Sequence, residues 1–241
     1  MQEQLREEAD GAILFDAEVS PQVDAGWFDP DHWRGRDALR VQEGGRGGVA
    51  LIHTPIGECV LRHYRRGGMV ARLLGDRYRW SGADRTRPFA EFRLLAAIVE
   101  RGLPGPLPVA ARYRRHGGFY TADLITRRIP DTRTLAEHLA DGVLDAALAA
   151  SVGALVARFH REGIWHADLN AHNVLVTPTG LYLIDFDRGR QRRPTTGWRQ
   201  ANLRRLRRSL LKLAPPGHLT ATFEHAVWQP LLQAYQRTYA A

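Results

Sequence analysis

The chain has 241 residues and a formal net charge of +8, with 34 Lys and Arg residues against 26 Asp and Glu residues. Its hydrophobic fraction of 44% and its charged fraction of 25% are typical of a folded globular protein and exclude a largely disordered chain. One basic residue is a lysine, Lys212, which excludes any mechanism that needs an earlier lysine, and the single cysteine, Cys59, excludes an internal disulfide and a cysteine-based zinc site.

The N-terminal segment does not have the basic start of a signal peptide, because residues 1–10 contain four acidic residues and one arginine. The longest weakly polar run, residues 146–157, is shorter than the roughly 20 residues of a membrane-spanning helix. We therefore expect a cytoplasmic protein that is not integral to a membrane. A pI near 10.3 predicts an anionic partner, which leaves nucleic acid, a phosphorylated substrate and a membrane surface open.

The first half of the chain predicts strands and one helix. Residues 48–65 alternate in polarity around a proline–glycine turn, which indicates a β-hairpin. A helix is expected over about 88–100, because a proline stands at its start and Gly102 follows its end. Two further strands are expected, near 109–114 and 119–129.

The second half predicts mostly helices. They are expected over 134–139, 145–161, 199–213 and 219–239, with two short strands over 174–177 and 181–184. A strand-rich half followed by a helical half predicts an α+β fold of two lobes. We place the lobes at residues 1–128 and 129–241, with a hinge near 126–131.

One constellation of polar residues carries chemistry. His166, Asp168 and Asn173 are followed, twelve residues after Asn173, by Asp185-Phe186-Asp187. Phosphoryl transfer needs one carboxylate to accept the proton of the acceptor hydroxyl, and a carboxylate and an amide oxygen to hold magnesium across the phosphates. Alone, Asp168 could cap a turn and Asp185 could end a strand. The three residues together favour phosphoryl transfer.

At these residues the chain resembles the protein-kinase-like superfamily. The sequence His166-Ala167-Asp168-Leu169 with Asn173 is similar to its catalytic loop, and Asp185-Phe186-Asp187 is similar to its metal-binding triplet. The resemblance implies that the phosphate donor is ATP, that Asp168 is the base, and that Asn173 and Asp185 are Mg²⁺ ligands.

The superfamily also covers the ATP phosphates with a glycine-rich loop between two strands. The corresponding stretch contains Gly44, Gly45, Gly47 and Gly48. The resemblance assigns these glycines to the ATP phosphates, and a plain hairpin turn is the alternative.

A lysine on the third strand of that fold pairs with a glutamate on the following helix. Arg62 occupies the strand position here and Glu91 lies in the expected helix. Arginine can hold phosphate oxygens bidentately. Val60, two residues before Arg62, lies on the same strand face and would contact adenine. Arg62 could also be an exposed strand arginine, and a shifted register would favour His63, Arg65 or Arg66.

A narrower resemblance is to the kinases of 3-deoxy-D-manno-octulosonic acid (Kdo), in the lipopolysaccharide-core kinase group. It rests on residues 60–68, 88–92, 166–173 and 185–189. The resemblance implies ATP-dependent phosphorylation of the 4-hydroxyl of Kdo on a lipid A precursor in lipopolysaccharide core biosynthesis. Three departures from the protein kinases, Ala167, Asn170 and Asp187, favour a small-molecule or glycolipid acceptor over a protein.

The surplus positive charge is local. Residues 187–212 contain nine arginines, one lysine and one aspartate, a net +9, so the remaining chain carries −1. Leucines recur through residues 203–213 at three- and four-residue steps with arginines between them, which predicts a basic amphipathic helix. The leucines are expected in the core. The arginines are either solvated, or bind an anionic membrane surface or the acidic lipid A precursor, which would place the protein on the cytoplasmic face of the bacterial inner membrane.

Two other functions stay open: a protein or antibiotic kinase of the same superfamily, and a catalytically silent kinase-like module that binds membrane or RNA. The silent module is disfavoured because Asp168, Asn173 and Asp185 are all present. Nucleic acid is disfavoured because Trp198 is the one aromatic residue in the basic segment, and single-stranded nucleic acid favours several stacking aromatics.

Overall fold

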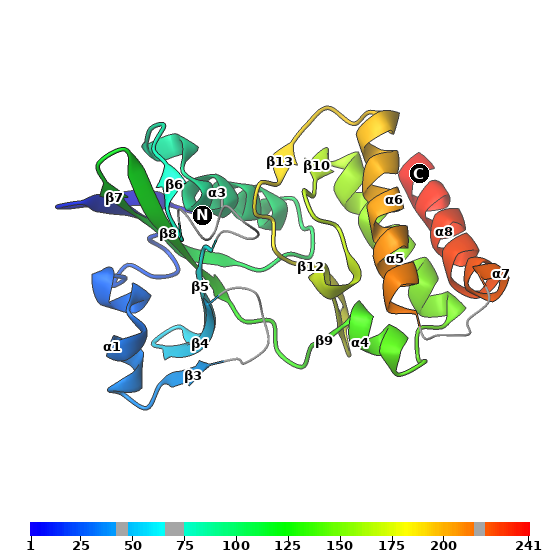
Figure 1. Cartoon of the computed structure of the whole chain (residues 1–241), viewed down its shortest axis with the longest axis horizontal. Coiled ribbons are helices and arrows are strands. Elements are labelled where there is room, and N and C mark those ends of the chain that lie inside the picture. Colours follow the sequence, from blue (N-terminus) through cyan, green and yellow to red (C-terminus); the bar gives the residue numbers. More distant parts are fainter. Residues whose placement is uncertain (42–47, 66–74, 215–219) are drawn as a thin grey trace. The chain divides into compact units, whose positions relative to one another are not determined.

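The computed structural model describes the chain apart from residues 42–47, 66–74 and 215–219 (Figure 1). Its internal contacts divide the chain into two units. The first unit comprises Met1–Ala97 and Pro106–Arg128, and the second comprises Ile98–Gly105 and Ile129–Ala241. The units therefore divide after Arg128, and the segment Ile98–Gly105 groups with the second unit rather than with the first.

The first unit is built on one antiparallel sheet. Its strands are β1 (Glu3–Glu8), β2 (Gly11–Asp16), β3 (Leu39–Val41), β4 (Gly48–Thr54), β5 (Gly57–His63), β6 (Tyr78–Arg79), β7 (Pro108–His116) and β8 (Phe119–Arg127). They follow the order β1-β2-β7-β8-β5-β4-β3, and β6 pairs with β8. The expected hairpin is β4 and β5, turning at Gly57, whose φ of 106° suits glycine. The strand expected over 119–129 ends at Arg127.

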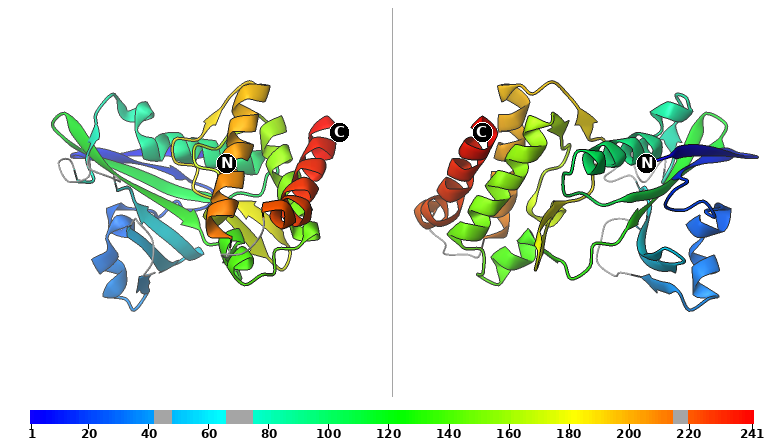
Figure 2. Two further views of the ribbon diagram at one scale, coloured as in Figure 1. Left: turned by 45° about the vertical axis from the view of Figure 1, so that its right-hand side comes forward. Right: turned by 180° about the vertical axis from the view of Figure 1, so that it is seen from behind.

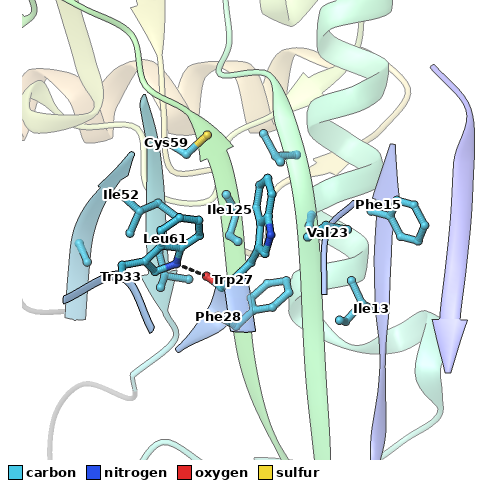
Figure 3. Packing of buried hydrophobic residues seen from close by; sticks show 13 residues of the cluster. Ile13, Phe15, Val23, Trp27, Phe28, Trp33, Ile52, Cys59, Leu61 and Ile125 are labelled. Atoms are coloured by element: carbon cyan, nitrogen blue, oxygen red, sulfur yellow. Dashed lines mark hydrogen bonds between the residues drawn. The ribbon is translucent and has the colours of Figure 1, made fainter. Parts of the chain in front are cut away.

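Two tryptophans form the centre of the first unit's core (Figure 3). They come from the short helices η1 (Ala25–Phe28) and α1 (Pro30–Arg34), which were not expected from the sequence. The indole N–H of Trp33 donates to the carbonyl of Trp27 at 2.8 Å, and the two rings meet edge to face at 5.6 Å. Asp29 caps α1 ahead of Pro30, a start signal that the sequence does contain.

Among the described residues of the first unit, one long helix packs on this sheet. After η2 (Ala83–Arg85), helix α3 (Arg87–Glu100) lies close to its expected bounds. Its apolar side buries Phe89 and Phe92. The ring of Phe89 lies 5.2 Å from the ring of Tyr113 on β7. This packing fixes which residues of α3 turn towards the sheet.

The second unit is mainly helical (Figure 2). Its helices are α4 (Leu135–Ala140), α5 (Ala146–Arg161), η3 (Ala171–Asn173), α6 (Thr196–Leu213), α7 (Thr220–Phe223), the π-turn η4 (Glu224–Trp228) and α8 (Gln229–Ala240). Its strands are β9 (Arg133–Thr134), β10 (Ile164–Trp165), β11 (Val174–Thr177), β12 (Gly180–Leu183) and β13 (Arg190–Gln191), arranged as β12-β11-β9 and β10-β13.

Helices α5 and α8 lie side by side, and a glycine permits their close approach (Figures 1 and 2). A Cβ placed on Gly153 of α5 would overlap the carbonyl oxygen of Leu231 of α8. The buried residues of α5, among them Val152, Leu155, Val156 and Phe159, form the middle of this unit. None of the described helices combines the length and the apolar character needed to cross a bilayer.

The C-terminal helix expected over 219–239 contains one widened turn. The described part has α7, a π-turn and then α8, with Pro230 in the first turn of α8. Proline has no backbone N–H to donate and its ring displaces the preceding turn, which explains the widened turn before it. The expected helix is therefore present over the described residues 220–240, and the π-turn inside it was not expected.

Candidate active site

In the first unit, Arg62 on β5 and Glu91 on α3 meet. Arg62 Nη2 lies 2.5 Å from Glu91 Oε2, and the Tyr64 hydroxyl donates to the same oxygen at 2.5 Å. The guanidinium also stacks over the Tyr64 ring, 4.5 Å from its centroid. Glu91 is 3% exposed, so its carboxylate holds the arginine from a buried position.

The rival His63 faces the opposite side of β5, because neighbouring strand residues alternate. Its Nδ1 lies 2.7 Å from Asp123 and its Nε2 lies 2.9 Å from Asp76. The hydrogen bond to Asp123, more than any other contact, raises the pKa of His63 above its ordinary value. His63 is therefore engaged with two carboxylates and is a poor alternative to Arg62. Of the other rivals, Arg65 is exposed and Arg66 lies outside the described residues.

The other residues expected at the nucleotide lie on or before the same hairpin. Val60 is half-buried on β5 and shares the strand face of Arg62. Gly48 is the first residue of β4 and pairs with His63. The glycines expected over the phosphates, Gly44, Gly45 and Gly47, lie outside the described residues.

In the second unit, the loop 166–173 follows β10 and is organised around His166. The backbone N–H of Asp168 donates to His166 Nδ1 at 3.1 Å. That nitrogen must therefore lack a proton, so Nε2 carries one and donates to the Ile184 carbonyl at 2.9 Å. Burial lowers the pKa of His166, which agrees with a neutral ring. His166 thus ties the loop to the end of the β11–β12 hairpin.

Asn173 makes a second tie between the same two segments. Its Nδ2 donates to the Asp168 carbonyl at 3.0 Å, and its own carbonyl accepts from Ile184 N–H at 3.0 Å. Asp185 follows Ile184 directly and has a left-handed φ of 61°, an uncommon conformation that packed surroundings must maintain. The structure therefore brings the segments of Asp168, Asn173 and Asp185 together within one unit.

Phe186, the middle residue of the triplet 185–187, packs into the interior of the second unit. Its ring stacks on Phe159 of α5 at 5.7 Å and meets the His166 ring at 4.8 Å. The side chain is fully buried. The middle residue of the triplet therefore serves packing, while Asp185 and Asp187 on either side are only half-buried.

Helix α6 holds the loop from the other side, which sequence reasoning missed. Asn202 donates from Nδ2 to the His166 carbonyl at 2.9 Å, and Ser209 Oγ accepts from Ala171 N–H at 3.1 Å. Between them, Arg205 Nη1 pairs with Asp168 Oδ1 at 2.8 Å. These contacts span 36 to 38 residues of sequence, so no local pattern signals them.

A buried polar chain continues behind Asn202. His160 Nε2 lies 3.3 Å from Asn202 Oδ1, and His160 Nδ1 lies 2.9 Å from the Tyr235 hydroxyl. Arg199 Nη1 donates to the same hydroxyl at 3.1 Å. Burial lowers the pKa of His160 to about 3, so its ring is neutral and both nitrogens have fixed roles.

The donor set at the loop suits a hard cation that is held mainly by phosphates. Because Asn173 Nδ2 is committed to the Asp168 carbonyl, its amide oxygen is the end that faces away from that bond. Asp185 supplies a carboxylate on the adjoining segment. Mg²⁺ is commonly held by one or two protein oxygens together with phosphates and water. No group of three or more His, Cys, Asp or Glu side chains that could hold a metal occurs among the described residues.

This arrangement can transfer a phosphoryl group. Asp168 offers a carboxylate that can accept a proton. Its side chain is 55% exposed, and its backbone is held by His166 and Asn173. Asn173 and Asp185 offer oxygen ligands for a cation beside the phosphates.

Comparisons with known proteins identify the family. The model of the lipopolysaccharide kinase (Kdo/WaaP) family matches residues 31–235. A protein of Xanthomonas campestris pv. campestris (strain B100) named 3-deoxy-D-manno-octulosonic acid kinase is 51% identical over 227 residues, which cover 94% of this chain and 90% of that protein. Proteins of the same name from Xanthomonas axonopodis pv. citri (strain 306) and Stenotrophomonas maltophilia (strain K279a) are 53% and 52% identical over 204 and 211 residues, covering 84% of this chain and 81% of theirs.

The fold is also similar to a solved structure described as WaaP in complex with acyl carrier protein. The TM-score is 0.57 at 19% identity, and the similarity covers 93% of this chain and 88% of that chain. It confirms the expected α+β, protein-kinase-like two-lobe fold. Since the family model and the relatives each cover most of the sequence, the chain belongs to the lipopolysaccharide kinase (Kdo/WaaP) family.

Proposed function

We propose that the chain is an ATP-dependent sugar kinase that phosphorylates the 4-hydroxyl of Kdo on a lipid A precursor, a step in lipopolysaccharide core biosynthesis. The observation that carries the acceptor is the identity of 51% and 53% to two relatives that are named for this sugar acid. The geometry around Asp168 supports the reaction class independently, because it rests on the chain's own contacts.

Asp168 acts as the base in this proposal. As the acceptor oxygen bonds to the γ-phosphorus and the bond to ADP breaks, the hydroxyl proton passes to the Asp168 carboxylate. The hydrogen bonds from Asp168 N–H to His166 and from Asn173 to the Asp168 carbonyl fix the backbone on which this carboxylate stands. Its exposure leaves room for an acceptor to approach.

The proposal gives roles toward ATP to residues of the first unit and, separately, to residues of the second. Arg62, oriented by Glu91 and Tyr64, binds phosphate oxygens, and Val60 contacts the adenine. The family resemblance assigns Gly44, Gly45, Gly47 and Gly48 to the ATP phosphates. Asn173 and Asp185 would hold Mg²⁺, which supplies neutralisation of the phosphate charge when bound.

The basic helix attaches the protein to the cytoplasmic face of the bacterial inner membrane. Leu203, Leu206 and Leu210 of α6 are buried, so they offer no apolar face for insertion. Arg204 and Arg208 are exposed, and each basic residue near an anionic leaflet contributes about 1 kcal/mol. Attachment is therefore electrostatic and peripheral.

Sedimentation with vesicles tests this attachment. Binding to phosphatidylglycerol-containing vesicles should fall steeply as salt rises, while phosphatidylcholine vesicles serve as the neutral control. Binding that does not depend on salt, or no binding to either vesicle, would leave the arginines as a solvated surface.

A transfer assay tests the reaction. The protein receives ATP and Mg²⁺ with a Kdo-bearing lipid A precursor, and in parallel with a generic protein substrate. We expect phosphate on the glycolipid and none on the protein. Transfer to the protein alone would indicate a protein kinase, and no transfer to either acceptor would favour a silent module.

A further inference from the structure

The ion pair between Arg205 and Asp168 joins α6 to the proposed base. Arg205 Nη1 lies 2.8 Å from Asp168 Oδ1, and the two side chains are 45% and 55% exposed. One of the five guanidinium N–H groups is used in this bond, so the others are open to an anion that approaches Asp168. An exposed pair of this kind adds little to folding stability.

The place of Arg205 is set by the helix that carries it. Asn202 and Ser209 hydrogen-bond to the backbone of the loop at His166 and Ala171. Residues three and four positions apart lie on one face of a helix, so Asn202, Arg205 and Ser209 all face the loop. The two neutral contacts thus hold the guanidinium beside Asp168.

The loop itself offers no equivalent charge. The position at which many protein kinases have a lysine is Asn170, and its amide is committed within the loop. Asn170 Nδ2 donates to the Asp168 carbonyl at 2.9 Å, and its Oδ1 accepts from His172 N–H at 2.8 Å. The positive charge beside the base comes from α6 instead.

We propose that Arg205 is a positioning residue for Asp168 that also binds a substrate oxyanion next to the accepting hydroxyl. This inference rests on the proposed function. The oxyanion has two possible sources, the carboxylate of the sugar acid and the transferred phosphoryl group. In Kdo the carboxylate is attached to the anomeric carbon, one deoxy carbon away from the carbon that bears the accepting hydroxyl, so both anions come close to the base.

Three variants test this role by steady-state transfer to the Kdo-bearing precursor. Arg205→Gln should lower kcat/KM for the acceptor by about 10- to 100-fold, the range expected for a lost charge-assisted hydrogen bond. Arg205→Lys keeps the charge without the planar fork and should recover part of the loss. Arg237→Gln removes an exposed arginine of α8 and is the matched control, with wild-type kinetics expected. Urea unfolding should give the same stability for all three.

An acceptor whose carboxylate is replaced by a carboxamide separates the two sources. If Arg205 binds the carboxylate, Arg205→Gln raises KM for the native acceptor and leaves KM for the carboxamide unchanged. If it binds the phosphoryl group, kcat falls with both acceptors, and hydrolysis of ATP without acceptor falls too. Either pattern supports the inference.

Wild-type kinetics in Arg205→Gln would overturn the inference and leave the proposed function intact. Absence of transfer by the wild type, or full transfer by Asp168→Asn, would overturn the proposed function and this inference together. A loss in Arg205→Gln that Arg205→Lys does not relieve at all, together with reduced stability, would mark Arg205 as structural and would also overturn it.

Discussion

The buried His160 predicts that the free energy of unfolding of the chain depends on pH. Its ring is 2% exposed, accepts a hydrogen bond from the Tyr235 hydroxyl and donates one to Asn202, the residue that holds the loop 166–173. Protonation would place a charge in this buried site and turn the nitrogen that faces Tyr235 into a donor. The perturbation we choose is His160→Gln, which replaces the imidazole by an amide that does not titrate and can still form hydrogen bonds.

The magnitude follows from the pKa difference between the two states. The pKa of His160 is about 3 in the folded chain, because burial disfavours the charged ring, against an ordinary value of 6.5 in the unfolded chain. The unfolded state therefore binds the proton first, so the stability is complete above pH 6.5 and is lost as the pH falls towards 3. At about 1.36 kcal/mol per pH unit, lowering the pH from 6.5 to 5 costs about 2 kcal/mol.

Urea unfolding of the wild type and of His160→Gln at pH 7, 6 and 5 measures this loss of stability directly. Other groups, including the buried His166, whose pKa is also lowered, titrate in both proteins, so the difference between the two isolates His160. We expect the advantage of the wild type over His160→Gln to shrink by about 2 kcal/mol between pH 7 and pH 5. An advantage that stays constant over this range would refute a neutral, buried His160.

Further predictions concern packing and nucleotide binding. Gly153→Ala should destabilise the chain by about 1–3 kcal/mol in urea unfolding, because a Cβ there meets the backbone of α8, whereas Gly197→Ala, with open space around it, should cost nothing. A result in which both changes are neutral would contradict the close approach of α5 and α8. Arg62→Ala should raise KM for ATP by about 10- to 100-fold, with Arg79→Ala on the exposed side of β6 as control. Unchanged ATP kinetics in Arg62→Ala would remove it from the phosphate site.

The sequence predicted the elements that have strong local signals. The helix over 88–100, the Ala-rich helix over 145–161 and the hairpin over 48–65 correspond to α3, α5 and β4–β5, because their periodicity and end signals are local. The family resemblance was likewise confirmed, because its motifs are short and contiguous.

The parts that were missed depend on tertiary pairing. Strand β1 is largely exposed and rich in charged residues, so no alternation marks it, and β6, β10 and β13 are two-residue strands that exist only through their partners. For the same reason, the contacts between α6 and the loop 166–173 could not be predicted from the sequence. Asn202 and Arg205 read as ordinary members of a basic helix until the fold places them against residues 166 and 168.

The central claim is that Asp168 takes the proton of the accepting sugar hydroxyl. Its most direct test compares wild type and Asp168→Asn in transfer from ATP to the Kdo-bearing precursor, with nucleotide binding measured separately by calorimetry. The isosteric amide cannot accept the proton, so we expect kcat to fall by about 10²- to 10⁴-fold while ATP affinity stays within a few-fold of wild type. Turnover in Asp168→Asn close to that of the wild type would contradict the account.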